Sequence, residues 1–247
     1  MSAPAMRLDL PRRVLVTGAA GGIGGAVARR LAAAGVGVIA TDLRGEAPDL
    51  VAADISTEAG RAAVVAAAGD GIGGIVHAAG IIDPCGWQEI GEAAMARIFA
   101  VNVIAPFLLT RVLLPKMDAG GSIVVLGSIA ARRAAPDTAA YAASKAALGN
   151  LAATLAQALA GSGIRVNTLA PGLIDTGLTR GLDHRLATAR HSTPAEVAAA
   201  RAAAVPVGRA GSPDEVADAC LYLLSRQAGY VDGATLFATG AALAGAI

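Results

Sequence analysis

A glycine-rich turn between a short apolar run and an alanine-rich stretch constrains the fold of this chain more than any other feature. The turn, Thr17-Gly18-Ala19-Ala20-Gly21-Gly22-Ile23-Gly24, follows a predicted strand at residues 14–17 and opens a predicted helix at residues 22–34. The glycines at 18, 22 and 24 permit a tight turn and close approach of a ligand to the backbone. A helix that begins there offers free N–H groups to a pyrophosphate. The turn therefore predicts a dinucleotide-binding fold.

Short apolar runs and longer alanine-rich stretches alternate along the chain. Further strands are expected at residues 37–41, 50–53, 74–78, 122–127, 165–170 and 235–238, and further helices at 58–68, 93–117, 139–160 and 213–225. This alternation predicts a parallel sheet covered on both faces. We expect an α/β chain of 247 residues that forms a single Rossmann-like, doubly wound domain with about seven strands and a flexible tail at residues 1–9.

Two segments depart from the alternation. The stretch between Asp42 and Asp54 is too short to hold a strand and a full crossover helix. Residues 175–209 are arginine-rich and look irregular, and proline bounds the segment at Pro171 and Pro206. A long segment of this kind in a compact domain is usually a binding element, so we expect a lid over the substrate.

Composition excludes several classes of function. The formal net charge is +1 and no basic block occurs, which argues against nucleic acid or an anionic membrane as partner. Two cysteines and three scattered histidines make neither a disulfide framework nor a metal site. The longest uncharged run, residues 146–164, is interrupted by polar side chains, and the N-terminus has no apolar signal region. We expect a cytoplasmic protein without metal.

An acidic residue ends the second predicted strand and bears on the choice of cofactor. A carboxylate at Asp42 would accept hydrogen bonds from the adenosine ribose and repel a 2′-phosphate, so NAD is favoured over NADP. Arg44 is the one nearby cation that would suit a 2′-phosphate, and Asp42 as a plain turn former is the alternative. Asp54-Ile55, after the third strand, would place a carboxylate near the adenine or simply next to a helix N-cap.

A tyrosine and a rare lysine form the strongest catalytic signal. Of twenty basic residues only Lys116 and Lys145 are lysine, and Lys145 lies four residues after Tyr141. On a helix the two side chains share a face. A free phenol has a pKa of about 10, and a neighbouring ammonium is expected to lower it toward the working range. Ser128, thirteen residues before Tyr141, completes the pattern.

With these motifs in place, the chain resembles the short-chain dehydrogenase/reductase family over residues 12–240. The resemblance rests on the glycine turn and on a set of residues spread along the chain: Asp54, His77-Ala78-Ala79-Gly80, Asn102, Ser128, Tyr141, Lys145, Asn167 and Pro171-Gly172. It implies oxidation of a secondary alcohol, or reduction of a ketone, by hydride transfer. Two donors near the reacting oxygen suit the charge that develops there.

The resemblance also implies residue roles. Tyr141 is the acid–base group, Lys145 lowers the pKa of Tyr141 and binds the nicotinamide ribose, Ser128 hydrogen-bonds the substrate oxygen, and Asn102 helps to hold a relay water. Ala79 and Gly80 allow the cofactor to approach, and the segment from Pro171-Gly172 to Thr176 covers the nicotinamide, with Ile174 and Thr176 as its contacts.

Two positions invite separate hypotheses. His77 stands where the family more often has asparagine, and we interpret it as a structural residue. Pro106 lies four residues after Asn102 in an expected helix, and its ring would free the Asn102 carbonyl to bind a water molecule. A plain kink is the equal alternative.

The sequence leaves the substrate open. Apolar residues flank the reactive end, and Arg132, Arg133 and Arg180 would meet an anionic substrate or a carrier protein unless they are simply solvated. The first interpretation is an NAD-linked dehydrogenase of a secondary alcohol, including a cyclic alcohol or dihydrodiol. The alternatives are a 3-oxoacyl-[acyl-carrier-protein] reductase and a non-catalytic dinucleotide-binding regulator. The family resemblance and two small-residue-rich helices imply a homotetramer or homodimer.

Overall fold

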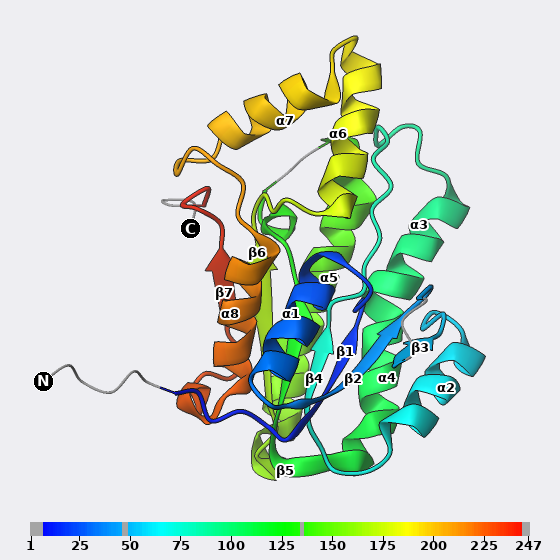
Figure 1. Ribbon diagram of the computed structural model, residues 1–247. Helices are drawn as coiled ribbons and strands as arrows, with labels where there is room; N and C mark the ends of the chain where they lie inside the picture. The colour runs from blue at the N-terminus through cyan, green and yellow to red at the C-terminus, as the bar shows by residue number, and fades with distance from the viewer. Residues whose placement is uncertain (1–6, 46–48, 134–135, 244–247) are drawn as a thin grey trace, which may run out of the picture.

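The computed structural model describes residues 7–45, 49–133 and 136–243, and its centre is a parallel sheet of seven strands. The strand order is β3-β2-β1-β4-β5-β6-β7 (Figure 1). The strands are β1 Arg13–Thr17, β2 Gly37–Asp42, β3 Leu50–Ala52, β4 Ile72–His77, β5 Met117–Leu126, β6 Arg165–Pro171 and β7 Thr235–Ala238. Each neighbouring pair is parallel. The predicted Rossmann-like, doubly wound α/β fold is confirmed.

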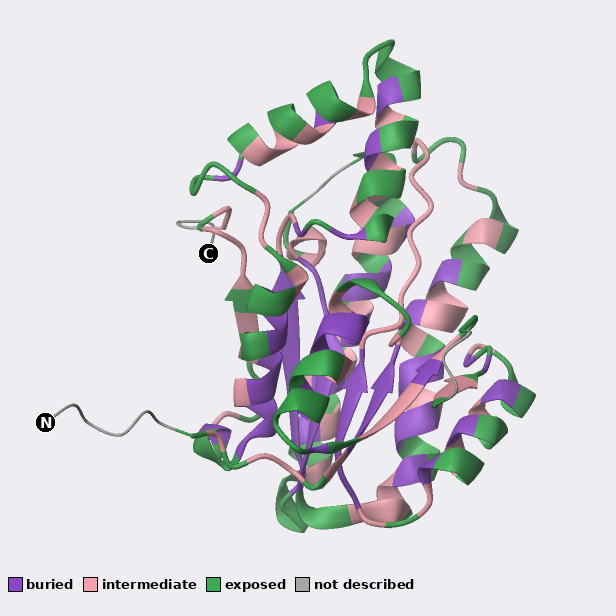
Figure 2. Cartoon of the chain, in the orientation of Figure 1, coloured by how far each residue is buried: buried purple, intermediate pink, exposed green. Residues whose placement is uncertain are grey.

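Helices cover both faces of this sheet. Their bounds are α1 Gly22–Ala33, α2 Glu58–Ala68, α3 Glu92–Phe99, α4 Ala105–Leu113, α5 Ala139–Leu159, α6 Gly177–Arg190, α7 Pro194–Ala203 and α8 Pro213–Leu224. Val14 and Val16 of β1 pack in a core with α1 and α8, while Leu15 packs in a second core with α2, α4 and α5. The central strands β1, β4 and β6 and the second half of β5 are accordingly almost wholly buried, and Figure 2 shows buried strands between helices whose outer faces are exposed.

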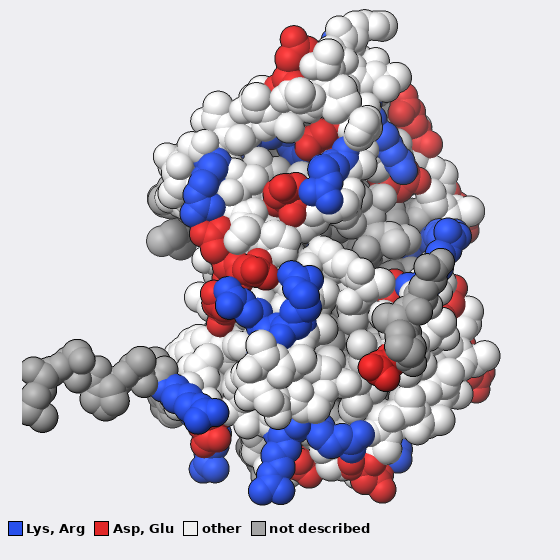
Figure 3. Space-filling view, viewed as in Figure 1, with Lys and Arg blue, Asp and Glu red and all other residues white. Residues whose placement is uncertain are grey.

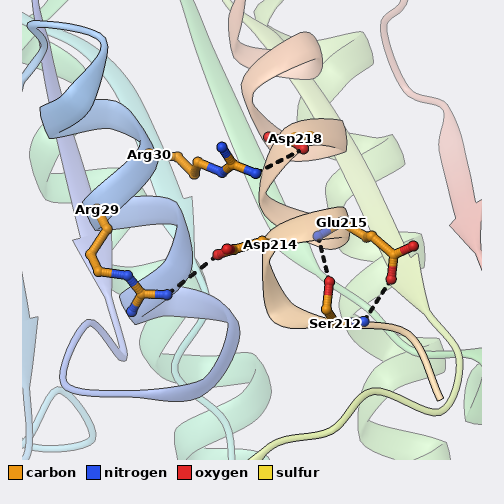
Figure 4. A network of polar contacts seen from close by, with 6 residues as sticks. All are labelled: Arg29, Arg30, Ser212, Asp214, Glu215 and Asp218. Atoms are coloured by element: carbon orange, nitrogen blue, oxygen red, sulfur yellow. Dashed lines mark hydrogen bonds and ion pairs between the residues drawn. The ribbon is translucent and has the colours of Figure 1, made fainter.

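Helices α1 and α8 lie side by side on one face and are joined by ion pairs. Arg29 contacts Asp214 at 3.3 Å and Arg30 contacts Asp218 at 3.2 Å (Figure 4). Ser212 caps α8, and the Glu215 side chain returns to the Ser212 backbone, which makes a capping box. On the face in Figure 3, basic and acidic side chains lie next to one another in this way.

The stretch predicted as one helix over residues 93–117 is interrupted. A π-helical turn, Ala100–Ile104, separates α3 from α4, and Pro106 stands at the start of α4. The sequence predicts a break in regular helical bonding at this proline. In the structure the break takes the form of a π-helical turn just before Pro106, a form often found at functional sites. By length and composition alone Glu92–Lys116 would pass as a membrane span, which is weak evidence because core helices pass the same test.

The segment at residues 175–209 is not irregular, which corrects the prediction. It folds into α6 and α7, which stand above the carboxyl edge of the sheet (Figure 1) and are here called the cap. Thr176 caps α6, and Thr193 with Glu196 forms a capping box on α7. These capping residues are visible in the sequence, and the prediction of an irregular segment did not take them into account.

The ends and the short connection follow the expectations only in part. Between Asp42 and Asp54 the described residues contain β3 and no helix, as the length predicts. Residues 1–6 of the expected flexible tail lie outside the described residues. The rest of the tail is held, because Asp9 and Arg7 form hydrogen bonds with Gln227, and the Asp9 carbonyl accepts one from Arg226.

Candidate active site

A cleft of about 450 Å³ opens at the carboxyl ends of the strands, and most of the predicted site residues line it. The predicted residues in its lining are Gly18, Gly22, Ile23, Gly24, Asp42, Ala79, Gly80, Ser128, Tyr141, Lys145, Pro171, Gly172, Ile174 and Thr176. The carboxyl edge of a doubly wound sheet is where such folds bind ligands. Here it brings together residues at the ends of β1, β2, β4, β5 and β6 with residues of α1, α5 and α6.

The glycine turn has the backbone conformation that a bound dinucleotide requires. Gly18 has a φ of +70°, and a Cβ there would lie 2.7 Å from the Ala79 nitrogen. A Cβ on Gly24 would lie 2.1 Å from the Gly18 oxygen. Helix α1 begins after Gly21, and none of the described side chains caps it, so its first N–H groups face the cleft. The turn thus fits a pyrophosphate.

The Asp42 carboxylate lies at the end of β2, beside the glycine turn. One oxygen accepts a hydrogen bond from the Ala20 N–H at 3.0 Å, and the other accepts one from the Leu43 N–H at 2.7 Å. These bonds fix the carboxylate at the wall of the cleft. Arg44 is exposed, and within the described residues it has no ion pair.

Asp54 and Ile55 lie outside the cleft lining. The Asp54 carboxylate accepts hydrogen bonds from the N–H and hydroxyl of Ser56, at 3.0 and 2.6 Å, and Thr57 caps α2. Their contacts therefore agree with the alternative that they lie next to a helix N-cap. Their predicted contact with adenine stays a prediction.

Tyr141 and Lys145 lie one turn apart at the start of α5, as the spacing predicts. The Lys145 nitrogen is 5.8 Å from the centre of the Tyr141 ring and donates a hydrogen bond to the Leu126 carbonyl at 2.6 Å. Burial lowers the pKa of Lys145 to about 8. Burial raises the pKa of Tyr141, and hydrogen bonding with Ser128 opposes this rise.

Burial thus outweighs other influences on the Tyr141 pKa in this structure, and the expected lowering by Lys145 stays a prediction. The lysine ammonium is engaged with a carbonyl, and desolvation of the phenol dominates. The Ser128 hydroxyl, meanwhile, accepts a hydrogen bond from the Ala130 N–H at 3.1 Å.

Asn102 is fully buried in the π-helical turn and does not line the cleft. Its amide donates to the Ile81 carbonyl at 2.9 Å and to the Ser144 hydroxyl at 3.0 Å, and its Oδ1 accepts from the Ile81 N–H at 2.9 Å. Both side-chain N–H donors thus serve protein partners, so a relay water would have to donate to an oxygen of Asn102, either the backbone carbonyl or the second lone pair of Oδ1. That role stays a prediction.

The segment after β6 forms the opposite wall. Ile174 pairs with Gly211 in an isolated bridge, and the Thr176 hydroxyl accepts a hydrogen bond from the Thr179 N–H at 3.2 Å. A Cβ on Gly22 would lie 3.7 Å from the Thr176 side chain, so this wall reaches the glycine turn. Thr176 both lines the cleft and begins the cap.

His77 is a buried structural residue. Its Nε2 lies 2.8 Å from the Thr110 hydroxyl, and its Nδ1 has no partner among the described residues. Burial lowers the pKa of His77 to about 4, so the ring is neutral at physiological pH. This agrees with the structural interpretation.

Three ion pairs involve helix α6 of the cap. Arg185 of α6 contacts Asp83 at 2.9 Å and Arg180 contacts Asp175 at 2.5 Å, while the buried Asp183 pairs with Arg201 of α7. Arg180 is therefore partnered. Two other arginines proposed for an anionic substrate, Arg132 and Arg133, are exposed and form no ion pair with the described part of the chain.

Sequence reasoning missed several lining residues: Ala78, Val101, Leu126, Gly127, Gly177 and Thr179. Most of them adjoin a predicted residue in sequence, which was the available signal. Val101 reaches the cleft from the π-helical turn, whose geometry no sequence pattern indicated. In the described residues there is no cluster of side chains that would hold a metal.

Known proteins resemble this chain in both sequence and structure. A family model described as "Enoyl-(Acyl carrier protein) reductase" matches residues 18–240. A cis-4-hydroxycyclohexanecarboxylate dehydrogenase of Sinomonas cyclohexanicum is 36% identical over 93% of this chain and 95% of its own length.

Two solved structures are similar. A short-chain dehydrogenase family protein from Francisella tularensis has a TM-score of 0.89 at 29% identity, covering 95% of this chain and 99% of the other. A putative NAD(P)-dependent gluconate 5-dehydrogenase from Beutenbergia cavernae, with bound NADP, has a TM-score of 0.82 at 33% identity, covering 94% and 97%.

Proposed function

We propose that this protein uses NAD and acts on a secondary alcohol of a ring compound. The premise is that the chain belongs to the short-chain dehydrogenase/reductase family and is an alcohol/ketone oxidoreductase. The Asp42 carboxylate carries the cofactor part of the proposal. Held by two backbone N–H groups at the cleft wall, it suits ribose hydroxyls and disfavours a 2′-phosphate. The Sinomonas relative, which by its name oxidises a cyclic alcohol, supports the substrate part.

The residues of the cleft fit a nicotinamide dinucleotide and divide the remaining work among them. When bound, the dinucleotide accepts or supplies the hydride. In alcohol oxidation the Tyr141 phenolate takes the hydroxyl proton, and in ketone reduction the phenol returns it. Ser128 donates a hydrogen bond to the substrate oxygen. Lys145, close to the Tyr141 ring, favours the phenolate once its ammonium turns from Leu126.

A reductase of acyl-carrier-bound ketones is the second candidate. A 3-oxoacyl-[acyl-carrier-protein] reductase of Vibrio cholerae, 33% identical over 92% of this chain and 95% of its own length, supports it, and a protein of similar fold from Beutenbergia holds NADP. This candidate requires NADPH to be accepted beside Asp42, with Arg44 as the available cation. Preference for NADP is therefore the property that separates the two candidates.

The test is turnover with NAD or NADP on a panel of cyclic and linear secondary alcohols, 4-hydroxycyclohexanecarboxylate among them, followed by nicotinamide absorbance. We expect NAD to be preferred by kcat/KM. Asp42→Ser should reduce that preference, whereas the matched change Asp54→Asn, outside the cleft, should leave it nearly unchanged. A wild-type preference for NADP would overturn the reading of Asp42.

We also propose that the protein is a cytoplasmic homodimer or homotetramer. The apolar residues Met95, Ile104 and Val112 are exposed along Glu92–Lys116, at 43%, 49% and 43%, which supports pairing of this surface with another copy. The free thiols of Cys85 and Cys220 suit a reducing compartment. Light scattering of wild type and Ile104→Glu tests the assembly, and a monomeric wild type would contradict it.

A further inference from the structure

Ser144 is a fully buried residue one position before Lys145, and its hydroxyl joins two parts of the site. It donates a hydrogen bond to the Tyr141 carbonyl at 2.7 Å and accepts one from the Asn102 amide at 3.0 Å. A helix does not need the first bond, because the Tyr141 carbonyl already accepts a hydrogen bond from the backbone N–H four residues later. The hydroxyl therefore ties the first turn of α5 to a neighbouring element.

That neighbouring element continues to the cleft. Asn102 holds the Ile81 backbone through both its N–H and its carbonyl, and Ile81 lines the cleft. A Cβ on Gly80 would lie 3.3 Å from the Lys145 nitrogen and 3.4 Å from the Asn102 Oδ1, so the loop after β4 packs closely against both. A continuous chain of hydrogen bonds thus runs from Ile81 through Asn102 and Ser144 to Tyr141.

Tyr141 stands in the first turn of α5, which begins at Ala139, and its side chain is hydrogen-bonded with Ser128. The first turn of a helix is the part with the fewest backbone bonds, because its N–H groups have no partner within the helix. The bond from Ser144 to the Tyr141 carbonyl therefore adds an anchor where the helix itself gives little constraint.

We propose that Ser144 is a positioning residue for the reaction: it fixes the Tyr141 phenol and the Lys145 ammonium relative to the loop at Ile81 by way of Asn102. This inference rests on the proposed function, since it assigns Tyr141 the proton transfer. Displacing a reacting group by a fraction of an ångström costs rate rather than affinity. Loss of the Ser144 hydroxyl should therefore reduce kcat and leave cofactor affinity nearly intact.

The experiment compares Ser144→Ala with Thr154→Ala in the full-length protein. Thr154 lies on the same helix and also donates to a backbone carbonyl, that of Asn150 at 3.0 Å, but it is exposed and has no link to the cleft. We expect Ser144→Ala to lower kcat about tenfold, to change the NAD dissociation constant by less than about twofold, and to move the acidic limb of the kcat profile to higher pH. Thr154→Ala should change none of these.

Ser144→Cys is only slightly larger than serine and keeps a weak donor, so it should recover part of kcat. It replaces Ser144→Ala in the comparison if the melting temperature shows that Ser144→Ala folds poorly. An unchanged kcat and pH profile in Ser144→Ala, or an equal loss in Thr154→Ala, would overturn the inference. Tyr141→Phe separates the two proposals. If it is inactive while Ser144→Ala is normal, only the role of Ser144 fails, whereas an active Tyr141→Phe refutes the proposed catalysis itself.

Discussion

The wall of the site formed by Ser128, Tyr141, Lys145 and Asn102 and the cap formed by α6 and α7 are held in different ways. Buried hydrogen bonds to backbone groups hold the wall, such as Lys145 to Leu126 and Asn102 to Ile81. Ion pairs hold the cap, and most of them are exposed to solvent. Backbone-anchored groups are fixed with the whole sheet, whereas surface ion pairs contribute little. The difference predicts that the wall determines the reaction and that the cap adjusts access and substrate range.

The sharpest test of this comparison is the phenol of the wall. Tyr141→Phe removes the proton-transfer group while keeping the ring, so we expect kcat to fall about 10³-fold with the fold intact. Steady-state turnover and circular dichroism measure this. Tyr230→Phe is the matched control, because that phenol is fully exposed, and its turnover should equal wild type. Equal losses in both variants would break the comparison.

One ion pair of the cap behaves like the wall, because Asp183 is only 5% exposed. Arg201→Met would leave this carboxylate buried without its partner, which typically costs about 3–5 kcal/mol. We expect faster hydrogen exchange over residues 177–203 and a raised KM, with kcat less affected. Arg180→Met, whose partner Asp175 is exposed, should leave exchange unchanged. If both variants exchange alike, the burial of Asp183 does not stabilise the cap.

His77 extends the comparison to pH, because it supports the strand that leads into the wall. Its pKa is lowered from 6.5 to about 4 in the folded chain. As the pH falls, His77 therefore takes up its proton in the unfolded chain before it does so in the folded chain. The free energy of unfolding is fully present above pH 6.5 and declines as the pH falls toward 4, by up to about 3 kcal/mol. Thermal unfolding across this range should show a shallower decline in His77→Asn. An identical pH dependence would exclude His77 as its source.

The smallest effect is expected at the exposed pair of the cap, Arg185 with Asp83. Such a pair contributes at most about 1 kcal/mol, so Arg185→Gln should change KM by less than about fivefold and leave kcat unchanged. Raising the salt concentration should reproduce the change in wild type and have no further effect in the variant. A large loss of kcat would show that the cap takes part in the chemistry.

The sequence was most informative where one pattern allowed one local structure. The glycine turn, the Tyr141–Lys145 spacing and most strands appear at or near the predicted positions, because backbone sterics and helix periodicity act over a few residues. An exception is β5, which begins at Met117 and not at residue 122. The cap was predicted as irregular because α6 is polar and because the clearest signals of both helices are their N-terminal caps.

Taken alone, the sequence determined the fold class, the place of the cleft and most of the residues that line it. Only the tertiary structure decided how those residues are held. That Lys145 donates to Leu126, that Tyr141 is desolvated, and that Asn102 joins Ser144 to Ile81 depend on contacts between segments far apart in the chain. A pKa and a hydrogen-bond partner are set by surroundings in space, and local patterns carry no record of them.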